Sequence, residues 1–240
     1  MVPLHICQHP RGERALPRPV TIDMDFGISL GASAGQYGTL GSDLQAQGFR
    51  RSMKYEGRIE RREEGFTVYV NFLVEDGKFF RGTRMVDDIP ANVMPGVVRA
   101  LETARAVPLQ GTDLYGAKQQ VTARVCEVGP FLVLKLRAML IRQHGKDAFD
   151  ILYTLLHYDG GMDAAIRAFA VEAQAGNPAM PEARQALETL FADETASGPV
   201  KAAHFVLGPY QSGESLATRQ RRQEICQDMV SAAAALRRAL

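Results

Sequence analysis

The sequence has few cysteines, almost no net charge and no long hydrophobic run, and each shortage excludes a class of protein. Cys7, Cys126 and Cys226 lie far apart without a C-x-x-C pair, so neither a disulfide scaffold nor a thiolate metal site is expected. Lys and Arg number 28 against 27 Asp and Glu, which gives no long-range field to recruit nucleic acid or an anionic membrane. No stretch approaches the ~20 apolar residues that cross a bilayer, and no signal-peptide core is present. We therefore expect a cytoplasmic protein with no membrane partner.

The apolar residues that are present suffice for a sizeable core, and their spacing changes along the chain. The 240 residues are 46% hydrophobic. Apolar and polar residues alternate in short segments of the first half, which predicts strands over 21–30, 58–62, 65–74 and 120–128 and helices over 38–49 and 90–106. The second half has helical spacing, with helices predicted over 130–143, 146–158, 163–175, 181–191 and 213–240. We expect an α+β fold, in which a small twisted mixed β-sheet with flanking helices is followed by a helical C-terminal region.

Two carboxylates alternate with apolar residues in the first predicted strand. Asp23 and Asp25 would share one face, with Met24, Phe26 and Ile28 on the other. Acids two residues apart on a strand can hold one or two divalent cations, and Mg²⁺ combines such oxygen ligands with substrate phosphates. The pair is therefore a candidate phosphoryl-transfer site. An isolated D-x-D is also typical of an exposed strand face, where acids serve solubility.

A second candidate site lies in the helical half. Lys135 stands inside the apolar run 131–139, where an ammonium is costly unless it reaches solvent, a carboxylate or a phosphate. Asp147 and Asp150 would share a helical face that could meet Arg142 or Lys135 of the preceding helix. A purely structural hairpin explains the same residues, with Asp147 as a helix cap and Asp150 paired with Arg142.

Both segments resemble sequence blocks of one family. Residues 18–26, R-P-V-T-I-D-M-D-F, resemble the acidic stretch of the AbiEii/AbiGii toxin-type family of the nucleotidyltransferase superfamily, which has a DNA polymerase β-like fold. Residues 134–152, L-K-L-R-A-M-L-I-R-Q-H-G-K-D-A-F-D-I-L, resemble the second block of that family, and the two blocks occur in the family's order. The resemblance implies a nucleotidyltransferase-like α/β core over 1–128 and a helical C-terminal region over 129–240.

The resemblance also implies an activity and a set of site residues. The activity is transfer of a nucleotidyl group from a nucleoside triphosphate to an RNA or protein acceptor, with Mg²⁺ as the cofactor. The chain would be the toxin that pairs with a cognate antitoxin protein, or a housekeeping relative. The implied roles are metal binding by Asp23 and Asp25, nucleotide contacts by Arg18, Thr21 and Lys135, and orientation of the lysine or deprotonation of the acceptor by Asp147.

Two departures from the family pattern favour an alternative function. No Gly-Gly or Gly-Ser turn precedes the acidic strand, so either Met1 is internal to a longer reading frame or the helix that receives the triphosphate is lost. Segment 69–73 resembles the strand that carries a third metal-binding carboxylate, but Asn71 stands at that position, and an amide oxygen is a poorer Mg²⁺ ligand. Glu75 or Asp76 could compensate, although a turn explains both. The alternative is a catalytically degenerate or N-terminally truncated member that acts as a binding or scaffold protein.

Overall fold

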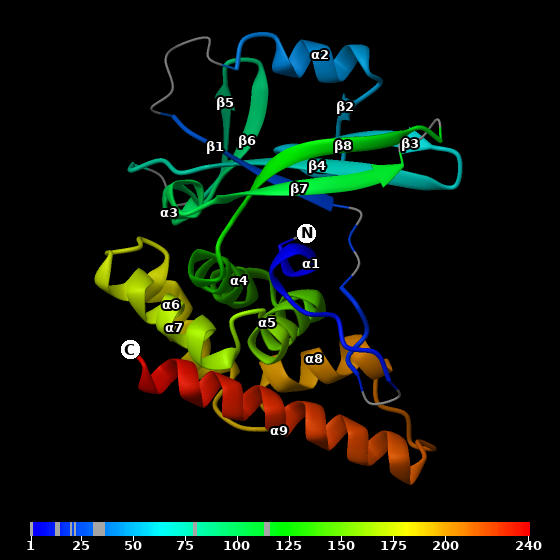
Figure 1. The fold of residues 1–240 in the computed structure, drawn as a ribbon, viewed down its shortest axis with the longest axis vertical. Helices are drawn as coiled ribbons and strands as arrows, with labels where there is room; N and C mark the ends of the chain where they lie inside the picture. Colours follow the sequence, from blue (N-terminus) through cyan, green and yellow to red (C-terminus); the bar gives the residue numbers. More distant parts are fainter. Residues whose placement is uncertain are drawn as a thin grey trace. The chain divides into compact units, whose positions relative to one another are not determined.

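The computed structural model describes residues 2–12, 15–19, 21, 23–30, 37–78, 81–112 and 116–240. Its class is α+β, as predicted, with a curled mixed sheet, flanking helices and a helical C-terminal region (Figure 1). The chain divides into two compact units, a sheet unit of Val20–Glu102 and a helical unit that combines Val2–Pro19 with Thr103–Leu240. The sheet unit is therefore an insertion between two stretches of the helical unit. The domain boundary expected after residue 128 stays a prediction.

The sheet unit is built around its longest described strand, β4. Its strands are β1 (Asp23–Ile28), β2 (Arg50–Arg51), β3 (Arg58–Glu63), β4 (Phe66–Val74), β5 (Thr83–Val86) and β6 (Ile89–Val93). Strand β1 pairs in parallel with one edge of β4. On the other edge of β4, β3 pairs antiparallel with the first part of the strand and β6 pairs parallel with its end. Because β1 pairs directly with β4, the acidic strand lies beside the centre of the sheet.

Alternation along β4 separates a core face from a polar face. Val70, Phe72 and Val74 point into the core of this unit, where helix α2 (Leu40–Ala46) packs through its leucines. The residues between them lie on the opposite face, since successive strand side chains alternate. The apolar face predicted for β1 is only partly covered, because Phe26 touches the ring of Phe72 yet remains 47% exposed.

The prediction of a helix over 90–106 is wrong for most of that segment. Residues Ile89–Val93 form strand β6, helix α3 spans only Val97–Glu102, and strand β7 begins at Arg105. Strand β6 lies between β4 and β5 and is buried on both faces, so its apolar residues run on without the alternation that marks a half-buried strand. Pro90, the first residue of the predicted helix, stands inside this strand opposite Met85.

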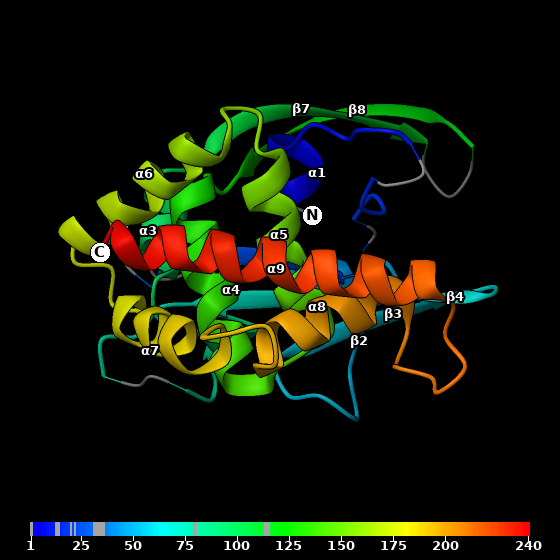
Figure 2. The same ribbon diagram turned by 90° about the horizontal axis from the view of Figure 1, so that it is seen from below.

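The helical unit has two central helices, α4 (Val128–Arg142) and α5 (Gly145–His157). Helices α6 (Met162–Gln174) and α7 (Met180–Leu190) pack on α4, and α8 (Ser197–Leu207) packs on α5. The long helix α9 (Leu216–Arg238) crosses the outside of this bundle (Figure 2). The unit also contains a two-stranded ribbon, β7 (Arg105–Thr112) with β8 (Lys118–Val125). Apart from α8, which was not predicted, these long helices begin and end within a few residues of the predicted bounds.

The N-terminal segment is part of the helical core. Helix α1 (Pro3–Ile6) packs on α5, and Ile6 is fully buried there. Two backbone hydrogen bonds join the segment to the end of α5, from Gln8 to His157 at 2.8 Å and from Asp159 to Ile6 at 2.9 Å. The Tyr153 hydroxyl lies 2.7 Å from Nδ1 of His9. These contacts assign residues 2–12 to the bundle rather than to the sheet that follows them in sequence.

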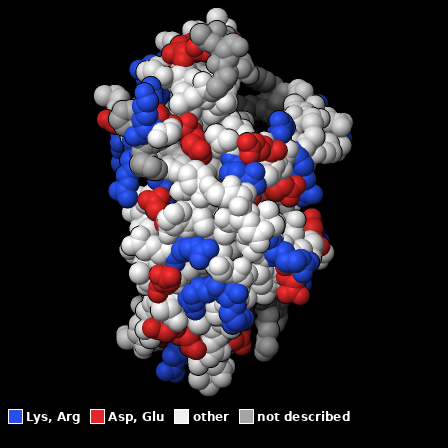
Figure 3. All heavy atoms as spheres, turned by 90° about the vertical axis from the view of Figure 1, so that its left-hand side faces the viewer, with Lys and Arg blue, Asp and Glu red and all other residues white. Residues whose placement is uncertain are grey.

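The hydropathy of the helices and the distribution of surface charges agree with what the composition predicts. No helix among the described ranges is both long enough and apolar enough to cross a bilayer. On the face shown in Figure 3, Lys and Arg side chains are interspersed with Asp and Glu. A polyanionic partner would therefore find no broad field of one sign on this face, as the near-neutral composition indicates.

Candidate functional site

The acidic pair lies on one face of β1, as predicted. The parallel register places Asp25 opposite Asn71 and Asp23 opposite Tyr69 of β4. The Asn71 side chain, which is buried, donates a hydrogen bond from Nδ2 to Oδ1 of Asp25 at 2.8 Å. Asn71 thus stands on the neighbouring strand beside the acidic pair, where the sequence placed it, and it holds one carboxylate oxygen.

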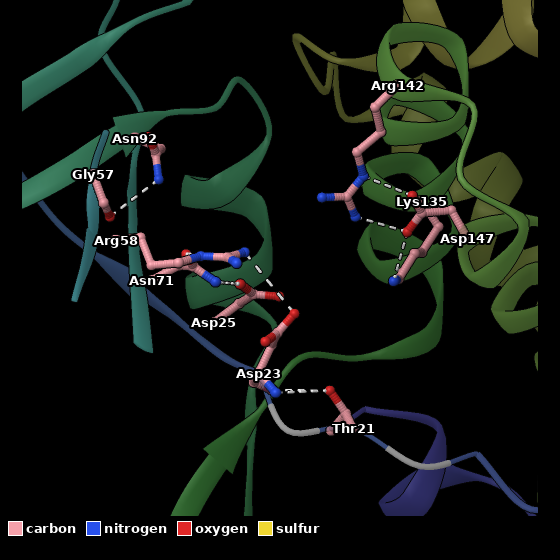
Figure 4. Close-up of polar contacts among 10 residues, drawn as sticks. All are labelled: Thr21, Asp23, Asp25, Gly57, Arg58, Asn71, Asn92, Lys135, Arg142 and Asp147. Atoms are coloured by element: carbon pink, nitrogen blue, oxygen red, sulfur yellow. Dashed lines mark hydrogen bonds and ion pairs between the residues drawn. The ribbon is translucent and has the colours of Figure 1, made fainter. Parts of the chain in front are cut away.

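A cation that the sequence reasoning missed completes this group. Arg58 of β3 pairs with Asn71 from the other side of β4 and donates from Nε to the Asn71 Oδ1 at 2.9 Å (Figure 4). Its Nη2 lies 3.9 Å from Oδ2 of Asp23. A row of side chains therefore runs across three strands from carboxylate to amide to guanidinium.

Helix α3 closes one end of the same face. Gly27 follows Asp25 by two residues, and a Cβ built there would lie 3.1 Å from side-chain atoms of both Val97 and Leu101. A larger residue would have to displace those two side chains. Glycine therefore lets α3 approach β1 closely, next to the carboxylates.

The residues at this face fit a metal ion only in part. Asp23 and Asp25 supply the hard oxygen ligands that Mg²⁺ prefers, and their side chains are accessible. The Asn71 oxygen accepts from Arg58 and its nitrogen donates to Asp25. Across the described residues, no group of three or more His, Cys, Asp or Glu is placed to hold a metal. The donor set therefore suits an ion held by two carboxylates and completed by water and phosphate oxygens.

The other residues considered near the acidic strand have local roles. The Thr21 hydroxyl accepts a hydrogen bond from the Asp23 backbone N–H at 3.1 Å, which fixes the start of β1. Arg18 is exposed and belongs to the helical unit. Glu75 accepts from the Gly96 N–H at 2.5 Å, just before α3, and Asp76 pairs with Arg84. The turn explanation agrees with the contacts of Asp76, which also accepts from the Lys78 N–H at 2.9 Å, whereas Glu75 binds the start of α3. The nucleotide contacts expected of Thr21 and Arg18 stay predictions.

A cavity of the sheet unit lies away from this chemistry. It has a volume of about 260 Å³ and is lined by α2 and by Ile59 and Phe72. Those two side chains alternate with Arg58 and Asn71 on their strands, so the cavity opens on the opposite face of the sheet. It therefore does not serve the acidic pair.

The second candidate group lies wholly within the helical unit. Lys135 Nζ lies 3.0 Å from Oδ1 of Asp147 and 2.7 Å from Oδ2 of Asp150. Arg142 contacts Asp147 with two nitrogens, at 2.7 and 2.8 Å, and Lys146 lies 2.8 Å from Asp150. The predicted contact of this acidic helix face with Lys135 and Arg142 is confirmed. The predicted pairing of Asp150 with Arg142 is wrong, because Asp150 contacts the two lysines instead.

Burial and the neighbouring charges shift the pKa values of this group in opposite directions. The Asp147 and Asp150 side chains are only 1% and 2% exposed. Burial by itself would raise the pKa of Asp147, but the charge of Lys135 and the hydrogen bonds from Arg142 outweigh it and lower the pKa to about 2. Burial would lower the pKa of Lys135, yet Asp147 and Asp150 raise it above its ordinary value. Both carboxylates are therefore held by cations, and Lys135 stays protonated.

No family model, curated protein or solved structure matches this chain.

The predicted site residues thus form two separate groups, one in each unit. Asp23 and Asp25 lie together on β1, with Asn71 and Arg58 as their partners. In the helical group, Lys135 contacts Asp147. All residues of a group belong to the same unit. The catalytic and nucleotide-binding roles of these residues stay predictions.

Proposed function

We propose that this protein is a metal-dependent nucleotidyltransferase that moves a nucleotidyl group from a nucleoside triphosphate to a hydroxyl of an RNA or protein acceptor. The observation that carries the proposal is the placement of Asp23 and Asp25 on one accessible face of β1, beside the central strand of the sheet. The sequence resemblance supports the same activity and adds a cognate antitoxin as partner, and the cytoplasmic setting is the one expected from the composition.

Each candidate residue has a physical task within its own unit. Asp23 and Asp25 would hold Mg²⁺, which when bound supplies charge neutralisation at the phosphates and lowers the pKa of an attacking hydroxyl. The Asn71 amide fixes the orientation of Asp25 through its hydrogen bond. In the helical unit, Lys135 would contact a phosphate, and Asp147 keeps that lysine protonated and in place.

A second candidate function is that of a non-catalytic binding protein. The observation in its favour is the contact of Arg58 and Asn71 with the acidic pair. An arginine beside two carboxylates offsets part of their charge without a metal ion, and the row is then a structural network that only resembles a catalytic site.

Calorimetric titration with each nucleoside triphosphate and Mg²⁺ tests the proposal. We expect metal-dependent binding that Asp23→Asn with Asp25→Asn weakens by roughly 100-fold or more, because both metal ligands lose their charge. Asp43→Asn with Asp163→Asn is the matched control, since it removes two exposed carboxylates elsewhere, and it should bind as the wild type does. Transfer of α-³²P from the bound nucleotide to RNA or protein of a cell extract then identifies the acceptor.

Two outcomes of this titration would favour the binding protein over the enzyme. One is the absence of heat with every nucleotide, from protein whose circular dichroism shows that it is folded. The other is nucleotide binding that is equally tight in the double variant and without Mg²⁺.

A further inference from the structure

Arg58 occupies a position at the acidic pair that its surroundings have fixed. Its guanidinium carbon lies 4.8 Å from the centre of the Tyr55 ring and 5.0 Å from that of Tyr69. Both contacts are within the range of favourable cation–π attraction. Together with the hydrogen bond to Asn71, they hold the charge toward Asp23. The arginine is thus positioned by three side chains and is not a loose surface residue.

The loop that carries Tyr55 is itself anchored to the sheet. The Gly57 carbonyl accepts a hydrogen bond from Nδ2 of Asn92 on β6 at 3.2 Å. Gly57 has a φ of 68°, and a Cβ there would clash with the Asn92 amide. Only glycine therefore allows the chain to enter β3 at this angle, which sets the position of Arg58 one residue later.

We propose that Arg58 is an internal cation that keeps divalent metal off Asp23 and Asp25 until an anionic nucleotide draws the guanidinium away. A divalent ion held by Asp23 would have a like charge beside it, and the ion would compete with Arg58 for the same carboxylate. Arginine binds phosphate through the same planar fork that it offers to carboxylate, so a triphosphate gives Arg58 an alternative partner. Metal binding and nucleotide binding are coupled as a result.

This inference rests on the proposed function, because it takes the acidic pair as the metal site and a triphosphate as the ligand. It adds a specific property to that site. Metal alone binds weakly to the wild type, and the site fills when metal and nucleotide arrive together. Arg58 is a positioning and regulatory residue in this account, since its effect on the metal acts through the carboxylates.

Electron paramagnetic resonance with Mn²⁺ alone, without nucleotide, tests the inference on the full chain. Arg58→Gln removes the charge and keeps an N–H group that can reach Asn71, and we expect it to bind Mn²⁺ about tenfold more tightly than the wild type, which is about 1.4 kcal/mol. Arg62→Met is the matched control, because Arg62 lies on the same strand, is 84% exposed and contacts Glu60 instead. Arg58→Lys keeps a charge and should change Mn²⁺ binding little.

The added substitutions Asp23→Asn and Asp25→Asn should abolish the gain seen in Arg58→Gln. If Arg58→Gln fails to fold, Arg58→Met replaces it with the same expected result. Unchanged, weaker or absent Mn²⁺ binding in the folded charge-free variant overturns the inference, and so does an equal gain in Arg62→Met. The transferase proposal is judged separately by nucleotide binding to the wild type. Tighter Mn²⁺ binding in Arg58→Gln with no nucleotide binding to the wild type would sink that proposal and the release of Arg58 by nucleotide, and it would leave only the exclusion of metal by Arg58.

Discussion

Replacement of Lys135 by methionine should lower the free energy of unfolding by about 3–5 kcal/mol, because two buried carboxylates lose the ammonium that they share. Asp147 keeps Arg142 and Asp150 keeps Lys146, but both of those cations are more exposed than Lys135. Chemical denaturation followed by the helical circular dichroism signal measures the loss. For a chain of this size the same change lowers Tm by roughly 10 °C.

Lys146→Met is the control for that experiment. Lys146 contacts the same carboxylate of Asp150 but is 35% exposed and belongs to an i,i+4 pair on α5, so its removal should cost less than about 1 kcal/mol. Equal losses of unfolding free energy in Lys135→Met and Lys146→Met would show that the burial of Lys135 adds nothing to the stability of the fold. A loss below about 1 kcal/mol for Lys135→Met would contradict the buried pair altogether.

Replacement of Asp147 by asparagine should cost about 2–4 kcal/mol at pH 6, and the cost should depend on pH. The pKa of Asp147 is lowered from 3.8 to about 2 in the folded protein, so its charge stabilises the fold at pH values above 3.8. That contribution is about 2 kcal/mol and is lost as the pH falls from about 4 to about 2. Unfolding curves of both proteins at pH 6, 4, 3 and 2 should therefore converge toward the acid end.

Asp163→Asn separates this effect from the helix dipole. Asp163 lies in the first turn of α6, as Asp147 does in α5, but it is exposed. Its removal should cost about 0.3–1 kcal/mol, the usual value for an acid near a helix N-terminus. If Asp147→Asn and Asp163→Asn behave alike at every pH, then Asp147 acts only as a first-turn acid, and its contacts with Lys135 and Arg142 add nothing to the stability of the fold.

Elements with a clear period were predictable from the sequence, and the exceptions have physical causes. The alternation around Asp23 and along β4 predicted both strands, and helical spacing predicted α4 to α7 and α9. Strand β6 gave no alternation because it is buried on both faces. Helix α8 was missed because Gly198-Pro199 is typical of a turn, whereas Gly198 is buried there and a Cβ would clash with Phe191.

The candidate site was predictable where its residues are neighbours in sequence. The period of two placed Asp23 and Asp25 on one face, and helical spacing brought Asp147 to a face that meets Lys135. Arg58 could not be found in this way, since its place depends on the register between β3 and β4 and on the parallel pairing of β1. No local pattern encodes such a register. The arginine that matters most to the acidic pair is therefore visible only in the folded sheet.

The insertion of the sheet unit into the helical unit has a consequence for synthesis. Ile6 leaves the ribosome well over a hundred residues before α5, whose end binds the N-terminal segment. At about 5–20 residues per second, that delay is on the order of ten seconds. The sheet unit is contiguous in sequence and can fold during this interval. The apolar side chains of the N-terminal segment stay exposed until α5, on which they pack, has been made. We therefore expect nascent chains that stop before α5 to be captured by chaperones through residues 2–12.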